Sequence, residues 1–302
     1  MEKNPPRLPG YQLPTKPHLS RGRETHGFLT PAQDLMPQVI SIPPRRVLPI
    51  IFLPGIMGSN LRMSAARQVA LEKTNNIAWR PENKTASIAL ANASPRQRQI
   101  QLDAAQTEVD TYEPARQSTG DANESSDHRH SAVTVSVRYP VSVGIDMPLL
   151  MDDPKSMPFA KTKEQKARER GWGEVFFGSY SELLETCELR LNTAFRRGKM
   201  DSWWRGIIGV APEEWQASPQ PRLIPLEEPA LKNALKDCWF PVHAMGYNWL
   251  ESNRKSGIVT AKRISALIEK YKAEGFQCEK VIVVTHSMGG VGRPCLDSPR
   301  NG

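Results

Sequence analysis

The sequence predicts an α/β protein whose sheet is mostly parallel and carries helices on both faces. Three segments near the end of the 302-residue chain support this prediction. An apolar strand over residues 241–249 is followed by an amphipathic helix around residues 258–271 and then by the β-branched run Val281–Val284. Strand, helix and strand in this order form a right-handed βαβ unit, which places both strands parallel in one sheet.

The first part of the chain divides into a tail and a core strand. Residues 1–44 are rich in Pro, Arg and Lys and lack periodicity, so we expect a disordered tail. The apolar run Val47–Leu53 ends at the turn pair Pro54-Gly55 and is typical of a core strand. Pro49 predicts that the start of this strand is irregular or at an edge. We interpret residues 45–302 as one α/β domain.

A long polar stretch, about residues 63–235, is interpreted as a large insertion in this domain. Within it, Val133–Tyr139 alternates apolar and polar residues like a half-buried strand. Ser179–Glu182 has the form of a capping box, and apolar residues then recur every three or four positions as far as Phe195, which predicts a helix. Gly275 is placed to end the later helix around residues 258–271.

A serine turn with small neighbours follows the Val281–Val284 strand. The segment Thr285–Gly290 has the strand–turn–helix setting of a nucleophile elbow, with Thr285 in place of the usual first glycine. Gly289 and Gly290 suit this turn because a strand and a helix cross closely there. The pattern predicts that Ser287 is a nucleophile for acyl transfer.

Acyl transfer also needs hydrogen-bond donors for the oxyanion that develops on the substrate. The backbone N–H of Met288, which opens the next helix, is one expected donor. The loop Pro54–Asn60 offers a second, the N–H of Ile56, and its Gly55 and Gly58 let the backbone approach a ligand closely. A tight turn is the alternative role for these two glycines.

These segments together resemble a known family. Leu53–Leu61, the Tyr247-Asn248-Trp249 strand with its helix, and Thr285–Gly290 resemble, in the same order, the lecithin:cholesterol acyltransferase and PGAP1-like branch of the α/β-hydrolase lipases. Arg170–Val175 and the Thr-for-Gly elbow are also similar to bacterial type VI secretion phospholipase effectors (Tle3-like). The resemblance implies an α/β-hydrolase fold and an ester or phospholipid substrate. It also implies Ser287 as nucleophile, Ile56 and Met288 as oxyanion donors, no cofactor and no metal.

The sequence departs from that family after the elbow. The family order is Ser, then Asp or Glu, then His, whereas only 15 residues follow Ser287 and none is a histidine. Asp297 is too close to the elbow to lie after a further strand. We therefore expect an α/β-hydrolase that is incomplete at its C-terminus and has little or no turnover. The alternatives are a non-catalytic fragment that binds lipid, a secretion-system component or an immunity protein, and a misfolded product without function.

Composition limits the remaining classes of function. The net charge is +8, but basic and acidic residues are intermixed, so we expect a solvated surface and no nucleic-acid binding. The N-terminus lacks the apolar segment of a signal peptide, and no apolar run approaches the ~18 residues of a membrane span. We expect a protein that is cytoplasmic as synthesised, with contact at a membrane surface and signal-independent export left open.

Several further residues are weighed and not assigned to the reaction. His286, adjacent to the nucleophile, and His243, in a strand, are expected to be structural. The polar segment around His128 and His130, with Asp121 and Asp127, indicates a solvated loop rather than a metal site. Trp203–Ile208 suits either a loop packed on the core or a lid that touches anionic lipid.

Overall fold

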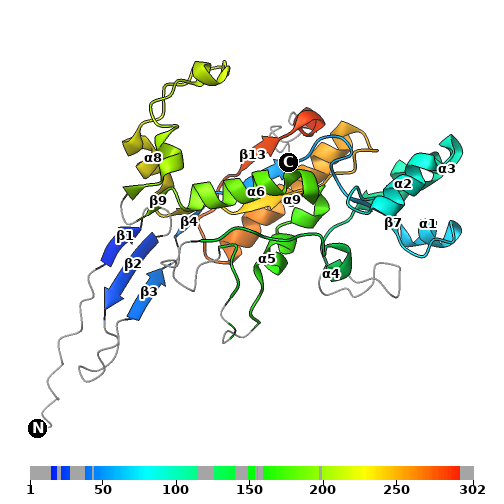
Figure 1. Ribbon diagram of the computed structural model, residues 1–302, viewed down its shortest axis with the longest axis horizontal. Helices are drawn as coiled ribbons and strands as arrows, with labels where there is room; N and C mark the ends of the chain where they lie inside the picture. Colours follow the sequence, from blue (N-terminus) through cyan, green and yellow to red (C-terminus); the bar gives the residue numbers. More distant parts are fainter. Residues whose placement is uncertain are drawn as a thin grey trace, which may run out of the picture. The chain divides into compact units, whose positions relative to one another are not determined.

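The computed structural model describes residues 15–18, 22–27, 38–42, 44–113, 126–139, 149–153, 155, 159–196 and 199–292. The chain forms two compact units (Figure 1). The larger unit contains residues 45–139, 148–193 and 239–302, and the smaller contains residues 1–44, 140–147 and 194–238. Every residue predicted to take part in catalysis belongs to the larger unit.

The centre of the larger unit is a three-stranded parallel sheet. Its order is β12 (Val242–Ala244), β5 (Ile50–Leu53), β13 (Ile282–Thr285). Both outer strands run parallel to β5, and Ile50 lies between Val242 and Ile282. β5 is buried along its whole length, as a purely apolar strand requires, whereas β13 is partly exposed. The predicted βαβ unit is present, with β5 between its two strands.

Helices cover both faces of this sheet. On one face, Ile51 and Leu53 pack with Ile264 of α9 (Asn253–Ala273). Side chains alternate along a strand, so Phe52 points to the other face. There its ring centroid lies 4.8 Å from that of Tyr180 in α6 (Phe177–Asn192). Successive residues of β5 therefore contact α9 and α6 in turn.

The expectation of a mostly parallel sheet holds for this central sheet, but several other described strands pair antiparallel. β6 (Leu61–Met63) lies between β7 (Ile77–Trp79) and β8 (Thr107–Val109), antiparallel to both. β9 (Phe195–Arg196) and β10 (Lys199–Met200) also pair antiparallel. Only two residues separate β9 from β10, and a connection that short permits only antiparallel pairing.

Several short helices lie in the insertion. Four α-helices before α6 begin after a polar residue whose side chain accepts a backbone N–H of the first turn. These helices are α1 (Ala65–Ala70), α2 (Lys84–Asn92), α3 (Pro95–Gln101) and α5 (Lys163–Glu169). The other described helical segments between β6 and α6 are η1 (Ala104–Gln106), α4 (Ser126–Arg129) and η2 (Trp172–Glu174).

Helix and strand boundaries test the local predictions. α9 ends as expected, since Gly275 has φ +90° just beyond it. α6 begins at Phe177, before the capping box expected at Ser179, because Glu82 accepts the Phe177 N–H at 2.6 Å from outside the helix. Val133–Val137 alternates between buried and exposed side chains as predicted, but it is not paired as a strand in the described part of the chain.

The smaller unit contains the N-terminal segment for which the sequence predicts no regular structure. The structure instead has three antiparallel strands there: β1 (Thr15–His18), β2 (Gly22–Gly27) and β3 (Gln38–Ile42). This unit also contains α7 (Ser202–Arg205), η3 (Pro212–Trp215) and α8 (Glu228–Leu235). Two short strands, β4 (Arg46–Val47) and β11 (Cys238–Trp239), complete the described elements before β12.

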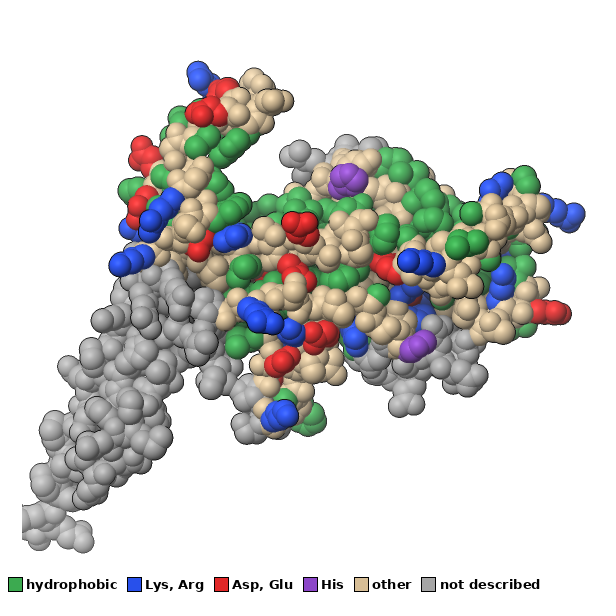
Figure 2. All heavy atoms as spheres, in the orientation of Figure 1, with side chains coloured by type: hydrophobic (Ala, Val, Ile, Leu, Met, Phe, Trp, Pro, Cys, Tyr) green, Lys and Arg blue, Asp and Glu red, His purple; other side chains and the backbone are tan. Residues whose placement is uncertain are grey.

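The surface agrees with the expected mixture of charges. On the face shown in Figure 2, basic and acidic side chains are interspersed. None of the helices in the described ranges is long and apolar enough to cross a membrane.

Candidate active site

Ser287 occupies a sharp turn between β13 and the short helix η4 (Ser287–Gly292). Its φ is +51°, in the left-handed region that non-glycine residues rarely adopt. Such a conformation costs about 1–3 kcal/mol and is retained only where the surrounding structure enforces it. The side chain is exposed. The predicted elbow therefore has the backbone strain and the exposure that a presented nucleophile needs.

The elbow is held closely against the end of β5. The N–H of His286 donates to the Leu53 carbonyl at 3.0 Å, and the N–H of Gly289 donates to the His286 carbonyl at 3.0 Å. A Cβ placed on Gly289 would lie 2.6 Å from the Pro54 carbonyl oxygen. Only glycine fits at this position, which explains why the elbow needs a small residue two positions after Ser287.

The loop after β5 lies beside the elbow, as the sequence predicts. The N–H of Gly58 donates to the Gly55 carbonyl at 3.0 Å and closes a turn in which Met57 has φ +60°. A Cβ placed on Gly55 would lie 3.1 Å from Cβ of Ser287. Gly55 thus serves a close backbone approach, and Gly58 is equally confined, because its Cβ would meet both Pro54 and Tyr180 at 2.9 Å.

The two expected oxyanion donors belong to these adjoining segments. Within the described part of the chain, the N–H groups of Ile56 and Met288 donate to no other residue. The Ile56 side chain is 50% exposed and Met57 is 42% exposed, so the loop presents apolar surface next to Ser287. Gly290 packs less tightly than Gly289, with its nearest contact at 3.3 Å from the Thr285 hydroxyl.

Tyr180 connects the loop to the elbow, which the sequence did not reveal. Its hydroxyl accepts the N–H of Gly55 at 3.3 Å and lies 3.1 Å from Nδ1 of His286. The spacing of α6 identifies Tyr180 only as one apolar position among several. His286 therefore makes the hydrogen-bonded contact that the sequence predicts for it.

The Arg170–Val175 segment joins the two loops that flank the site. The N–H of Asn60 donates to the Glu174 carbonyl at 2.8 Å, and the Glu174 carboxylate accepts the N–H of Gly246 at 2.9 Å. The same buried carboxylate forms an ion pair with Arg263 of α9 at 2.7 Å. One residue of the insertion therefore fixes both the loop after β5 and the loop after β12.

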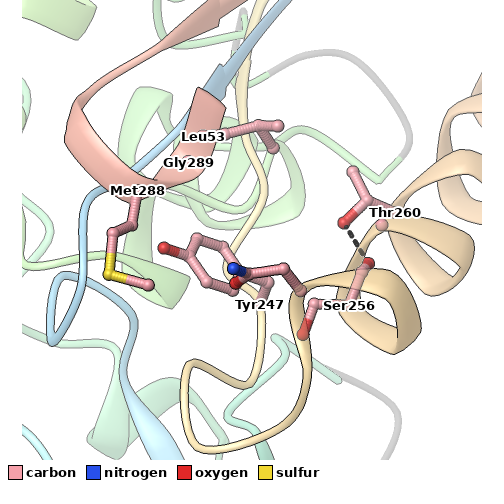
Figure 3. Close-up of a pocket in the computed structure, with 8 residues that line it drawn as sticks. Leu53, Tyr247, Ser256, Thr260, Met288 and Gly289 are labelled. Carbon is pink, nitrogen blue, oxygen red and sulfur yellow. Dashed lines mark hydrogen bonds between the residues drawn. The ribbon is translucent and has the colours of Figure 1, made fainter. Parts of the chain in front are cut away.

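A small pocket lies on the α9 side of the elbow (Figure 3). It has room for about one or two water-sized groups, and Figure 3 shows the hydroxyl of Tyr247 directed toward Met288. Tyr247 is 7% exposed, and its hydroxyl has no hydrogen-bond partner among the described residues. Burial raises the pKa of Tyr247 to about 12, so the phenol is a neutral donor at physiological pH.

The other histidines lie elsewhere in the core. His243 contacts the Tyr271 hydroxyl at 2.8 Å, and its burial, together with the charge of Arg170, holds its pKa well below the usual value. His130 is buried 3.7 Å from Asp110, so the expectation of a solvated loop is wrong at this residue. His128 is exposed, as expected. Asp121 and the side chain of Asp127 lie outside the described part of the chain.

Asp110 is the centre of a buried charge cluster. Arg80 donates to it, and Arg129 forms an ion pair with it at 2.8 Å. Burial alone would raise the pKa of Asp110, but the nearby His130, the charge of Arg80 and the hydrogen bonds from Arg129 hold it well below its usual range. No group of three metal-ligating side chains occurs in the ranges that the structure describes.

The Trp203–Ile208 segment has one buried and one exposed tryptophan, and its role as a lid that touches anionic lipid stays a prediction. Trp204 is buried, whereas Trp203 is 42% exposed. The segment therefore packs through one tryptophan and presents the other.

No protein-family model matches the chain, and no curated protein matches it. Among solved structures, a chain in the crystal structure of the Tle4–Tli4 complex is similar, with 30% sequence identity and a TM-score of 0.57 over 83% of this chain. The match spans 42% of that chain, so this chain corresponds to less than half of its length. The likeness agrees with an α/β-hydrolase-like fold and supports a Tle-like protein. It supports neither the lecithin:cholesterol acyltransferase and PGAP1-like branch nor Tle3.

Proposed function

We propose that this chain carries the nucleophile and the oxyanion donors of a serine ester hydrolase, with an acyl-enzyme formed on Ser287. The observation that carries the proposal is the contact between two segments far apart in sequence. Ser287 is held at φ +51°, and the Gly55 backbone lies directly against its Cβ. This contact supports an arrangement in which the N–H groups of Ile56 and Met288 would both face the oxygen of a substrate carbonyl.

The reaction follows from these positions. The Ser287 Oγ attacks the ester carbonyl and loses its proton to solvent water, and the carbonyl oxygen becomes an oxyanion that the two N–H groups stabilise. The alcohol then leaves, and the acyl group stays on Oγ. In the described part of the chain, no basic side chain hydrogen-bonds to the Ser287 hydroxyl. Acylation by an activated ester should therefore be slow, and deacylation slower still.

The substrate is proposed to be an ester with an apolar acyl group, such as a lipid. The exposed side chains of Ile56 and Met57 would contact that group beside the nucleophile. Support also comes from the likeness to Tle4 and from the resemblance of the elbow to phospholipase effectors. Because Tle4 was crystallised in a complex with Tli4, we extend the proposal to a protein partner of the immunity kind for this chain.

A second candidate is a protein that binds lipid without hydrolysing it. The observation that favours it is that, among the described residues, no basic side chain hydrogen-bonds to the Ser287 hydroxyl. This candidate predicts lipid binding that survives Ser287→Ala.

Covalent labelling tests the proposal without requiring turnover. The full chain is incubated with p-nitrophenyl butyrate, and its intact mass and peptide map are measured. We expect one butyryl group on Ser287, lost in Ser287→Ala and kept in Ser181→Ala, a matched change on α6. Labelling that is the same in all three proteins would reject Ser287 as the nucleophile.

A further inference from the structure

A projecting segment of the smaller unit has most of its side chains in solvent. It comprises residues 209–226, and we name it the arm. The N–H of Gly209 donates to the Leu226 carbonyl at 2.9 Å and closes the base of the arm. From residue 213 to residue 225, every residue except Pro219 is exposed. In Figure 1 the arm is the yellow-green loop that extends beyond α8.

Large apolar side chains are among the exposed groups of the arm. Trp215 and Leu223 are more than half exposed, and Ile224 is 85% exposed. Single exposed apolar residues are common on protein surfaces, but several on one projecting segment mark a surface that another molecule covers. Tryptophan is also one of the residue types that contribute most to such contacts. The arm therefore has the composition of a binding element.

The arm and its border are acidic, although the whole chain has a net charge of +8. Arg222 is the only basic residue in the sequence from 209 to 227, and it pairs with Glu213 at 3.0 Å. Glu214 and, just beyond the arm, Glu227 are exposed and form no ion pair with the described residues. Acidic and hydrophobic side chains are both visible on the arm in Figure 2. Such an arm complements a basic surface that also exposes apolar groups.

The outward side of α9, in the larger unit, has this complementary character. Ile258 and Val259 are adjacent aliphatic residues that are both exposed. Arg254 and Lys262 lie four positions before and after Ile258, so the three side chains share one stripe of the helix. Both basic side chains are exposed, and neither forms an ion pair with the described residues. We name these four residues the α9 face. The opposite side of α9 packs on the central sheet through Ile264.

We infer that the arm of one copy of this chain binds the α9 face of a second copy. The apolar side chains of the arm cover Ile258 and Val259, and its carboxylates lie near Arg254 and Lys262. A second copy is the partner because one sequence supplies both complementary surfaces, always at equal concentration. The contact joins two different surfaces, so a pair of copies keeps one free arm and one free α9 face. Assembly therefore continues to a ring or a longer chain.

Sedimentation velocity of the full chain tests the association. The protein is measured from about 1 to 200 µM, in roughly 50 mM and 500 mM NaCl. We expect dimers and larger species at the upper concentrations. The apparent Kd should rise at least about threefold at the higher salt concentration, because the contact includes exposed charges that salt screens. A chain that stays monomeric over this range would overturn the inference, as would assembly that salt does not weaken.

One substitution on each surface should block the contact. Ile224→Lys adds a positive charge to the arm, and Ile258→Glu adds a negative charge to the α9 face, so each variant repels its partner surface. Either should weaken self-association by about tenfold or more. Val69→Lys on α1 and Ile88→Glu on α2 are matched controls at exposed aliphatic positions, and each should change it by less than about twofold.

Arm and α9-face variants that associate as their controls do would reject the inference. Thermal unfolding verifies that each variant is folded. If Ile258→Glu does not fold, Lys262→Glu replaces it, because Lys262 is an exposed side chain of the same α9 face. Lys262→Glu should weaken self-association by at least about threefold.

Mixing the two variants separates this contact from a symmetric one. Ile224→Lys keeps an intact α9 face, and Ile258→Glu keeps an intact arm. Neither should associate alone, but an equimolar mixture should form a one-to-one dimer and no larger species. A mixture as monomeric as its components would reject the pairing of arm with face. Ile258→Glu that associates alone would also reject it, because the contact would then join two arms.

Two further measurements separate other outcomes. A chain that stays monomeric but sediments with phosphatidylserine vesicles, and loses this binding in Ile258→Glu, would assign the α9 face to a membrane and reject the second copy. Ser287→Ala should assemble as the unchanged protein does, because the contact does not involve the elbow. A chain that assembles but is not acylated at Ser287 would support this contact and reject the proposed hydrolase. A chain that is acylated but stays monomeric would do the opposite.

Discussion

Replacing Gly289 with alanine is the sharpest test of how the elbow is built. The added Cβ would lie 2.6 Å from the Pro54 carbonyl oxygen and 2.8 Å from that of Leu53. Both atoms belong to backbone at the end of the central strand, so neither can rotate away as a side chain would. Restoring an ordinary contact of 3.4 Å requires the elbow and β5 to separate by up to about 0.8 Å.

The loss of stability and of labelling rate expected for Gly289→Ala follows from this displacement. Overpacking a tightly packed site costs about 1–3 kcal/mol, and here the strain falls on the segment that positions Ser287 and the Met288 N–H. Each kcal/mol lowers the melting temperature of a unit of this size by about 2–4 °C. A shift of this size at the oxyanion donors should also slow the labelling of Ser287 by about 100-fold.

Gly290→Ala is the matched control, because its Cβ would approach only the Thr285 hydroxyl, at 3.3 Å. The assay combines thermal unfolding with the rate of butyryl labelling. We expect Gly289→Ala to have a lower melting temperature and a lower rate of butyryl labelling. Gly290→Ala should resemble the unchanged protein in both. Equal melting temperatures and equal labelling rates would refute the contact between the elbow and the Pro54 carbonyl.

Two further outcomes follow from named contacts. Tyr180→Phe keeps the ring on β5 but loses the hydroxyl between Gly55 and His286, so we expect a loss of about 0.5–1.5 kcal/mol in stability and slower labelling of Ser287. The depressed pKa of Asp110 stabilises the folded state above its unfolded pKa of about 3.9, and this contribution is lost as the pH falls below that value. The free energy of unfolding, measured with urea between pH 3 and pH 7, should therefore depend less on pH in Asp110→Asn than in the unchanged protein.

Each of these outcomes has its own control. Tyr139→Phe removes a hydroxyl that lies 3.4 Å from Glu188, away from the elbow, and should leave the labelling rate unchanged. Asp201→Asn removes a carboxylate from the smaller unit and should keep the acid sensitivity of the larger one. If Asp110→Asn loses stability on acidification as steeply as the unchanged protein, Asp110 does not carry that dependence.

The features that the sequence predicted correctly are local. The elbow at Ser287, the loop at Gly55 and the end of α9 near Gly275 each depend on neighbouring residues, so a short pattern contains all the information needed. The elbow at Ser287 and the loop at Gly55 contact each other because loops after parallel strands meet at one edge of the sheet. The structure places both loops at that edge.

The features that the sequence did not reveal depend on distant partners. Tyr180 meets His286 across 106 positions, and Glu174 meets Arg263 across 89. Nothing near either residue distinguishes it from an ordinary helix or loop position. The predicted start of α6 was wrong for the same reason. The N–H of Phe177, the first residue of α6, donates to Glu82, which lies 95 positions earlier in the chain. Tertiary contact overrode a local signal there.

The position of β5 in the middle of the sheet has a consequence for synthesis of the chain. Ile50 pairs with Val242 on one side and with Ile282 on the other, so its neighbours leave the ribosome about 190 and about 230 residues later. At ~5–20 residues per second, this strand waits roughly ten seconds or more before either neighbour exists. During that interval its four apolar residues can pair only with foreign strands or with a chaperone. The nascent chain should therefore depend on chaperone binding near its N-terminal strand far more than the finished protein does.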